Sequence, residues 1–181
     1  MKRRLLILPL LLLAAAAPGG KEKAAVKTPE KISDYASFSA PAGWTSGEKT
    51  EQGDPQARLE KGPHVIVARL CGGPGSRYKN QREFLGGFEA RSTGGKPAAK
   101  TGTTVVSGAR VLLYARKVPL ALPPPDESGP AAMGEEAFCL VPAGKRFFVL
   151  TYSYGDPTPD PLYDGEKAWR EFLKGFRVKK R

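Results

Sequence analysis

The chain contains few of the side chains that carry out most enzyme chemistry. It has one histidine, His64, and two cysteines, Cys71 and Cys139. A Ser-His-Asp or Cys-His site would have to use His64, because there is no second imidazole. A zinc site needs Cys and His ligands at close spacing, which this sequence does not offer. We therefore predict no catalytic residues, no cofactor and no metal, and we interpret His64 as a structural or surface residue.

Each cysteine belongs to an apolar run typical of a strand, VIVARLC for Cys71 and AFCLV for Cys139. A disulfide requires two Cα atoms within about 7 Å, and hence neighbouring strands. The sequence leaves two alternatives open. Either Cys71 and Cys139 form a disulfide, which export permits, or they are two buried thiols that pack as small apolar side chains.

No apolar run long enough to span a membrane follows the N-terminal segment. That segment combines a basic start, Met1–Arg4, an apolar stretch, Leu5–Leu13, and small residues, Ala14–Ala17. This is the pattern of a secretory signal peptide, with cleavage expected after Ala16. We expect residues 1–16 to be removed and the protein to be exported: periplasmic in a Gram-negative bacterium, and otherwise secreted. An uncleaved anchor is the alternative, although the apolar stretch is short for a membrane helix.

Acidic residues are outnumbered, because 29 Lys and Arg against 18 Asp and Glu give a formal net charge of +11. Part of this excess forms a basic tail, Lys179, Lys180 and Arg181. Net charge bears on association rather than on fold. Since export separates the protein from nucleic acid, we expect another envelope protein as partner, with at most peripheral membrane contact through the tail. The alternative is that the charged ends are solvated.

The chain divides into a leader and one domain. Residues 17–33 lack the apolar side chains needed for packing, and we predict a flexible linker there. Residues 34–181 suit a single globular domain. Its proline-rich segment, Pro119–Met133, contains Pro123, Pro124 and Pro125 and is predicted to be a long surface loop.

Strands are predicted where apolar residues alternate or β-branched residues cluster between turn residues. Gln56–Glu60 with His64–Cys71, and Glu135–Val141 with Arg146–Tyr154, form two expected hairpins. The last run is the most apolar, which favours a central position in the sheet. Phe38–Trp44 is predicted to be a short strand. Residues 103–118 are predicted to be one long strand bent at Gly108.

Two helices are expected. The first covers Asn80–Arg91, where Phe84, Leu85 and Phe88 form one apolar stripe. The second contains Trp169, Phe172, Leu173 and Phe176, spaced as one face of an amphipathic helix. Together the elements predict an α+β fold: a mostly antiparallel sheet of about six strands flanked by helices.

An acidic run, Asp156, Asp160, Asp164 and Glu166, precedes and opens the second helix. Calcium prefers oxygen ligands, but the spacing does not match the EF-hand pattern. Turn formation and helix capping account for Asp160 and Asp164, and we favour this interpretation.

The run YASFSAPAGW at residues 35–44 resembles the opening strand of PsbP-like proteins. The closing stretch VPAGKRFFVLTYSYGDP and the helix WREFLKGFRV resemble the end of the same family. The family includes the extrinsic P subunit of photosystem II, proteins of the Ran-release factor fold, and exported bacterial DcrB-like proteins. The resemblance implies an α/β/α sandwich around an antiparallel sheet, and accessory or binding roles without shared catalytic residues. Many bacterial relatives are lipoproteins, and this chain departs from them because it lacks the lipid-attachment cysteine.

These observations favour an exported, non-catalytic accessory or protein-binding module of the cell envelope. We expect its interaction surface to include exposed residues of the loop and tail together with one aromatic side chain: Trp44, Pro123, Pro124, Pro125, Lys179, Lys180 and Arg181. One alternative is a protein that binds a small ligand or metal in a pocket between sheet and helix, lined by Trp44, Tyr152 and Trp169. A second alternative is a secreted hydrolase of unrecognised type.

Overall fold

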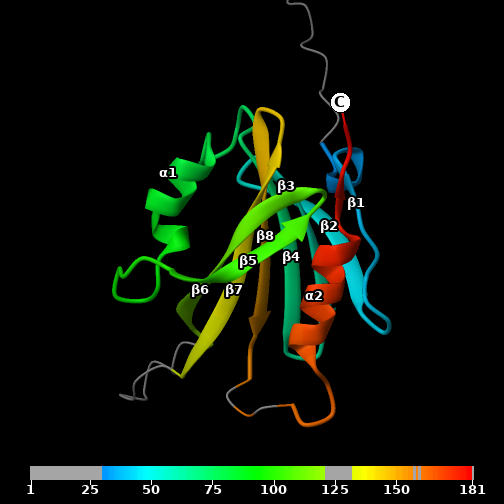
Figure 1. The fold of residues 1–181 in the computed structure, drawn as a ribbon, viewed down its shortest axis with the longest axis vertical. Helices are drawn as coiled ribbons and strands as arrows, with labels where there is room; N and C mark the ends of the chain where they lie inside the picture. Colours follow the sequence, from blue (N-terminus) through cyan, green and yellow to red (C-terminus); the bar gives the residue numbers. More distant parts are fainter. Residues whose placement is uncertain (1–29, 121–131, 157, 159, 181) are drawn as a thin grey trace, which may run out of the picture.

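The computed structural model describes residues 30–120, 132–156, 158 and 160–180. Its main feature is an antiparallel sheet of seven strands in the order β2-β3-β4-β8-β7-β6-β5 (Figure 1). The strands are β2 (Thr45–Glu51), β3 (Asp54–Lys61), β4 (His64–Cys71), β5 (Ala99–Val106), β6 (Ala109–Pro119), β7 (Met133–Ala143) and β8 (Arg146–Tyr154). A separate two-stranded sheet pairs β1 (Ala36–Ser37) with β9 (Arg177–Val178). The protein is therefore mainly β, with one strand more in its large sheet than expected.

Two α-helices pack on opposite faces of the large sheet. The helical elements are η1 (Ile32–Asp34), α1 (Gln81–Gly86), η2 (Phe88–Ala90) and α2 (Gly165–Gly175). Side chains alternate between the faces of a strand, and in β8 Phe147 and Val149 join the core on the α1 side. Phe148 and Leu150 join the larger core on the α2 side. The sheet twists, so β5 and β6 run obliquely across the other strands (Figure 1), and β5 contacts α2.

The structure confirms both predicted hairpins and the central place of the most apolar strand. β3 pairs with β4 and β7 pairs with β8, as the alternation predicts. β8 is the middle strand of the seven, between β4 and β7. A hydrophobic core and a helix cover each face of β8, and its sequence is therefore apolar almost throughout.

Two strand predictions are wrong. Residues 103–118 are not one bent strand but the β5–β6 hairpin, closed by a two-residue turn at Ser107 and Gly108. Both turn residues have positive φ, 51° and 80°, which is the backbone of a type I′ turn. The predicted strand Phe38–Trp44 is also absent. β1 ends just before this segment, at Ser37, and β2 begins just after it, at Thr45. β2 is an exposed edge strand, so its polar sequence carries no apolar alternation.

The predicted first helix is shorter than expected. Asn80 caps α1 by accepting a hydrogen bond from the Glu83 backbone N–H at 2.9 Å, as expected for a capping residue. The helix ends at Gly86, and η2 follows after Gly87. A Cβ on Gly87 would lie 2.5 Å from the Tyr78 ring, so this glycine permits the close packing of Tyr78.

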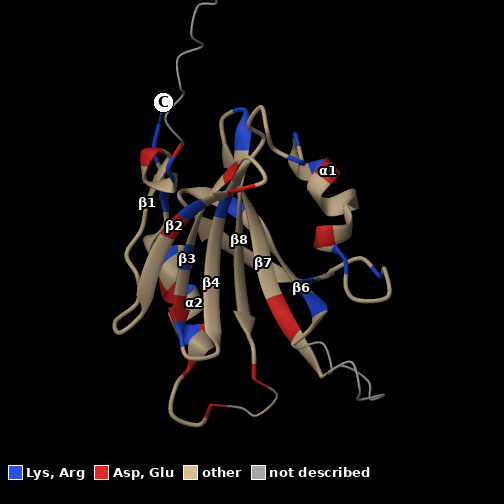
Figure 2. Ribbon diagram, turned by 180° about the vertical axis from the view of Figure 1, so that it is seen from behind, with Lys and Arg blue, Asp and Glu red and all other residues tan. Residues whose placement is uncertain are grey.

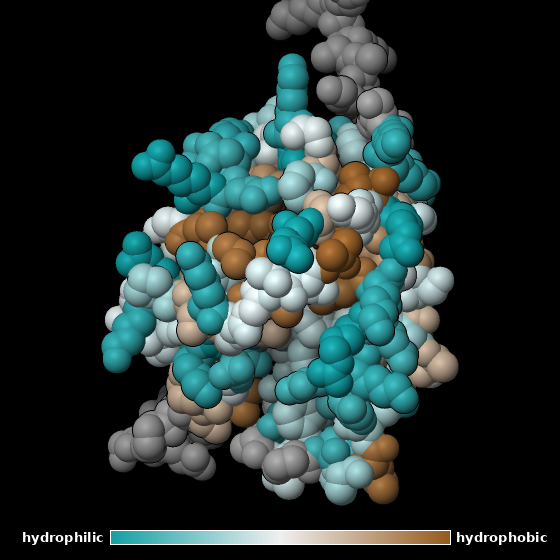
Figure 3. Space-filling view, in the orientation of Figure 1, coloured by the Kyte–Doolittle hydropathy of each residue, from teal (hydrophilic) through white to brown (hydrophobic). Residues whose placement is uncertain are grey.

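The predicted second helix is confirmed as α2, and its apolar stripe is buried on the sheet. Asp164 caps its first turn, since Oδ1 accepts a hydrogen bond from the Lys167 N–H at 2.8 Å. Phe172 lies at the centre of this contact, with ring centroids 5.5 Å from Phe38 and 5.8 Å from Phe176. The outward face of the helix is hydrophilic (Figure 3).

The packed domain begins earlier than predicted. Ile32 was expected in the flexible linker, but it is fully buried in the core on the α2 side. The predicted linker boundary at residue 33 is therefore too late, because η1 already packs against the sheet. The signal peptide, residues 17–29 of the predicted linker, and the loop prolines Pro123, Pro124 and Pro125 lie outside the described residues.

Candidate functional site

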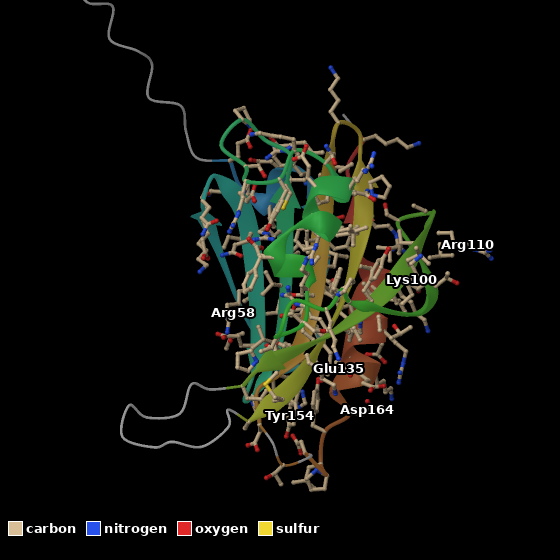
Figure 4. All side chains as sticks on the ribbon, turned by 90° about the vertical axis from the view of Figure 1, so that its left-hand side faces the viewer. Arg58, Lys100, Arg110, Glu135, Tyr154 and Asp164 are labelled. Carbon is tan, nitrogen blue, oxygen red and sulfur yellow. The ribbon has the colours of Figure 1, made fainter. Side chains whose placement is uncertain are left out.

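A groove of about 1180 Å³ lies between α2 and the face formed by β5, β6, β7 and β8. The segment between β8 and α2 closes one end of it. α2 and β5 both lie on the near side of the molecule in Figure 1, and residues of both line the groove. Figure 4 places Glu135, Tyr154 and Asp164, three of its lining residues, at the same end of the molecule.

Small side chains on the sheet create the floor of this groove. Ala115, Ala137 and Tyr152 are cross-strand neighbours on β6, β7 and β8. Cross-strand neighbours project from the same face of the sheet. The two alanines fill little space, whereas Trp169 and Leu173 of α2 stand opposite as larger groove walls. The small alanines therefore leave space on the floor beside the buried aromatic Tyr152.

His64, the sole histidine, lies at the inner end of the groove and is buried, with an exposed fraction of 4%. Its Nδ1 is 3.0 Å from the Tyr152 hydroxyl oxygen. Burial and the nearby carboxylates of Glu166 and Asp164 raise the pKa of Tyr152 to about 12. The phenol is therefore protonated at neutral pH, and a phenol can either donate to Nδ1 or accept from it. The Asp160 carboxylate, 3.5 Å from Nε2, favours the tautomer with the imidazole proton on Nε2, in which the phenol donates to Nδ1.

Four aromatic rings surround the imidazole. The ring centroids lie 4.6 Å away for Tyr154, 5.0 Å for Tyr163, 6.2 Å for Tyr152 and 6.3 Å for Trp44. Aromatic rings attract a cation that lies over their negative faces within about 6 Å. The protein already uses one of them in this way, since the Lys61 ammonium lies 3.8 Å over the Tyr163 ring. This end of the groove is an environment that favours positive charge.

Asp160 is the carboxylate next to His64. Its Oδ1 accepts a hydrogen bond from the Leu162 backbone N–H at 2.9 Å, and its Oδ2 lies 3.5 Å from His64 Nε2. Within the described part of the chain, Nε2 makes no hydrogen bond although it is buried. A buried N–H without an acceptor costs free energy, so this atom marks an incomplete polar site.

The structure confirms that residues of the acidic run form turns and cap α2. Asp160 forms its turn with Leu162, Asp164 caps α2, and Asp156 Oδ1 accepts from the Thr158 N–H at 2.8 Å. Over the residues that the structure describes, no group of three His, Cys, Asp or Glu side chains is arranged to hold a metal ion.

Three of the expected interaction residues are described by the structure: Trp44, Lys179 and Lys180. Trp44 is buried, with an exposed fraction of 8%, which corrects its assignment as a surface residue. Its indole N–H donates to the Tyr163 hydroxyl at 2.6 Å, so the side chain supports the wall around His64 from outside the groove. Lys179 and Lys180 are exposed beyond β9, and Arg181 lies outside the described residues. Of the expected pocket residues, Tyr152 and Trp169 line the groove and Trp44 does not.

His64 is the site residue whose role the sequence analysis underestimated. It belongs to HVIVARLC, in which alternate residues share a face, and Ile66, Ala68 and Leu70 are all fully buried. The same alternation places His64 on the buried face. This pattern was the available signal for a buried histidine, whereas its contact with Asp160 depends on a loop.

Cys71 and Cys139 are free and buried, so the disulfide alternative is wrong and the alternative of two thiols holds. β8 lies between their strands β4 and β7. Strands two apart in a sheet are separated by about 9.5 Å, beyond the reach of a disulfide. The two side chains also join the cores on opposite faces.

We expect neither thiol to react with an alkylating reagent at pH 8 in the folded protein. Burial raises the pKa of Cys71 and that of Cys139 to about 12, and the thiolate is the reactive form. In guanidinium chloride without reductant, mass spectrometry should find two labelled thiols per chain. A chain that takes up label in denaturant only after reduction would contradict the free thiols.

A second polar cluster lies on the α1 face. Arg69 pairs with Glu89 and Arg116 with Glu136, each at 2.5 Å, around a small cavity of about 140 Å³. Burial raises the pKa of Glu136 despite the opposing charge of Arg116. Each charge here has a partner of opposite sign, so the cluster stabilises its own geometry.

Comparisons with known proteins leave the family open. No family model and no curated protein matches the chain. A crystal structure of a protein from Bacteroides thetaiotaomicron VPI-5482 is similar over 84% of this chain, with 11% sequence identity and a TM-score of 0.48. The match spans 48% of that protein's length, so this chain corresponds to about half of it. No helix within the described residues is both long enough and apolar enough to cross a membrane.

Proposed function

We propose that this chain is an exported, non-catalytic binding module of the cell envelope that holds a small ligand in the groove between α2 and the sheet. Export is supported by the N-terminal pattern of basic, apolar and small residues. A role in binding is supported by the groove, which combines apolar walls with a few convergent polar groups.

The buried His64 Nε2 carries this proposal. If no ligand bound here, pairing this N–H group or exposing it to water would stabilise the folded protein. Here the ring is instead held between Tyr152 and Tyr154, with the unpaired atom facing Asp160 at the groove. This arrangement is typical of a polar group that orients a bound ligand.

The chemistry of the cluster favours binding over hydrolysis. A nucleophile activated by His64 would have to lose its proton to the imidazole. The group in hydrogen-bond contact with Nδ1 is the Tyr152 phenol, and its pKa of about 12 keeps it protonated. Tyr152 therefore acts as a hydrogen-bond donor that fixes the histidine.

The resemblance to PsbP-like and DcrB-like proteins supports the same general role, because that family is mostly accessory and binding proteins. Helices on both faces of an antiparallel sheet are compatible with the α/β/α sandwich that the resemblance implies. In this proposal the module docks on another envelope protein, and the exposed Lys179 and Lys180 near the C-terminus remain part of the proposed docking surface.

Filling the groove tests the proposal. Ala137→Trp places an indole on the groove floor, and Leu112→Trp adds the same ring on the opposite face of the sheet as a control. Addition of the small-molecule fraction of the native envelope should raise the Tm of the wild type and of Leu112→Trp. A ligand at 100 times its Kd stabilises by about 2.7 kcal/mol, or roughly 5–10 °C in Tm.

Ala137→Trp should lose this Tm increase while it retains the wild-type far-ultraviolet circular dichroism. If the indole disturbs folding, Thr104→Trp provides a second filling variant, because Thr104 lines the groove and pairs with Val111 on the α2 side of the sheet. An equal Tm increase in the filled variants, or no increase in the wild type with any fraction, would refute a ligand site in this groove.

A further inference from the structure

We infer that the ligand is an organic cation: an ammonium group on an apolar stem, with the ammonium bound at Asp160 and the stem along α2. This inference rests on the proposed function, since it names the ligand class of the same groove. Asp160, His64 and Tyr154 lie at one end, and Trp169 and Leu173 line the wall beyond them.

The charge of the groove is opposite to that of the protein. Five carboxylates line it against two cationic side chains, whereas the whole chain has a net charge of +11. These residues are Glu135, Asp156, Asp160, Asp164 and Glu166, with Arg170 and Lys174. In Figure 2 the loop between β8 and α2 carries acidic residues, while the β7–β8 turn and the C-terminus at the other end are basic. Such local negative charge attracts cations to the groove.

Three of these carboxylates already pair with a neighbouring cation. Glu135 pairs with Lys117 at 3.3 Å, and Arg170 pairs with Glu166 at 3.2 Å and with Asp164 at 4.0 Å. Asp156 and Asp160 have no ion pair with a lysine or arginine among the residues described. Asp160 is the better placed of the two, because its carboxylate is partly buried and is fixed by the Leu162 N–H.

The unpaired His64 Nε2 is a second, independent sign that a group is missing at this point. Asp160 Oδ2 is 3.5 Å away, slightly beyond a good N–H to oxygen hydrogen bond. A ligand ammonium bound to this carboxylate from the groove side would fix its position and allow the contact with Nε2 to close. One ligand cation would thereby pair with the carboxylate, and the carboxylate would in turn accept a hydrogen bond from the buried N–H.

The surrounding side chains suit the rest of such a ligand. Tyr154 lies beside His64 and offers a ring face to a cation. The stem would contact Leu113, Trp169 and Leu173, which line the groove between β6 and α2. Burial of this stem adds apolar area to the charge interaction.

Three probes with the same eight-carbon chain separate charge from apolar contact: octylammonium, octanol and octanoate. Isothermal titration at pH 7 and low salt should give the tightest binding for octylammonium. Raising the ionic strength should weaken octylammonium binding and leave octanol binding unchanged, because salt screens the charge interaction.

Asp160→Asn is the decisive variant, because the amide oxygen still accepts from the Leu162 N–H while the charge is removed. It should weaken octylammonium by about tenfold or more, since a hydrogen bond to a charged group contributes at least that factor. Glu60→Gln, an exposed carboxylate on β3 outside the groove, is the matched control and should bind as the wild type does.

Octanol or octanoate binding as tightly as octylammonium, and blocked by Ala137→Trp, would overturn the cationic class while the groove remains a ligand site. Undiminished octylammonium binding in Asp160→Asn would overturn the role of that carboxylate. Absence of binding by all three probes would also refute the inference, and the envelope-fraction experiment would then decide separately whether the groove binds a ligand of another class.

Discussion

Replacement of Phe172 by Ala is expected to lower the free energy of unfolding by about 3–5 kcal/mol, the usual cost of removing a buried phenylalanine. Phe172 is 2% exposed and lies between Phe38, Trp169 and Phe176, with ring centroids 5.5 to 5.9 Å away. Its loss leaves a cavity where α2 meets the sheet. The free energy of unfolding of a domain of this size is about 5–15 kcal/mol, so Phe172→Ala would remove a large fraction of the protein's stability.

The control for this prediction is Glu171→Ala, one residue earlier on the exposed face of α2. Such a surface change should alter the free energy of unfolding by less than about 0.5 kcal/mol. Urea unfolding, followed by circular dichroism, gives both values from the transition midpoints. A loss below about 1 kcal/mol for Phe172→Ala would show that α2 is not anchored through this ring.

Gly165→Ala is expected to destabilise the protein by about 1–3 kcal/mol, the cost of overpacking. A Cβ at Gly165 would lie 2.0 Å from the Tyr152 hydroxyl and 2.4 Å from His64 Nδ1. Because no side chain fits there, glycine at the start of α2 is what lets the helix approach the His64–Tyr152 pair. The substitution must displace either the helix or the pair, and so it should also weaken ligand binding.

Gly175→Ala at the other end of the same helix is the matched control. A Cβ there would meet no atom within 4 Å, so the change should be neutral or stabilise by up to about 1 kcal/mol through helix propensity. Thermal and urea unfolding should therefore show a loss of stability for Gly165→Ala and no loss for Gly175→Ala. Equal effects of the two substitutions would mean that the contact at Gly165 does not constrain the fold.

The sequence predicts those parts of the fold that depend on local pattern. The alternation in HVIVARLC and the apolar run RFFVLTYSY identify β4 and β8, and the spacing of Trp169, Phe172 and Phe176 identifies α2. These patterns follow directly from burial of one or two faces. The hairpin at Ser107 and Gly108 was missed because a glycine between two strand-like runs fits a bend as well as a tight turn.

Only part of the candidate site could be predicted, because some of its contacts depend on loop geometry. Tyr152 and Trp169 were expected in a pocket between sheet and helix, and they line the groove. The contact between His64 and Asp160 joins a strand to a loop far along the chain, and loop geometry leaves no periodic signal in sequence. The exposure of Trp44 was misjudged because its partner, Tyr163, lies in the same loop region.

The most direct test of the groove as the functional site is a map of amide chemical shifts in labelled protein, with and without the small-molecule fraction of the native envelope. The account predicts that the largest changes fall on residues of the groove: His64, Ala137, Tyr152, Tyr154, Asp160 and Trp169. Changes confined to the α1 face or to the basic C-terminal end, with the groove unaffected, would contradict it.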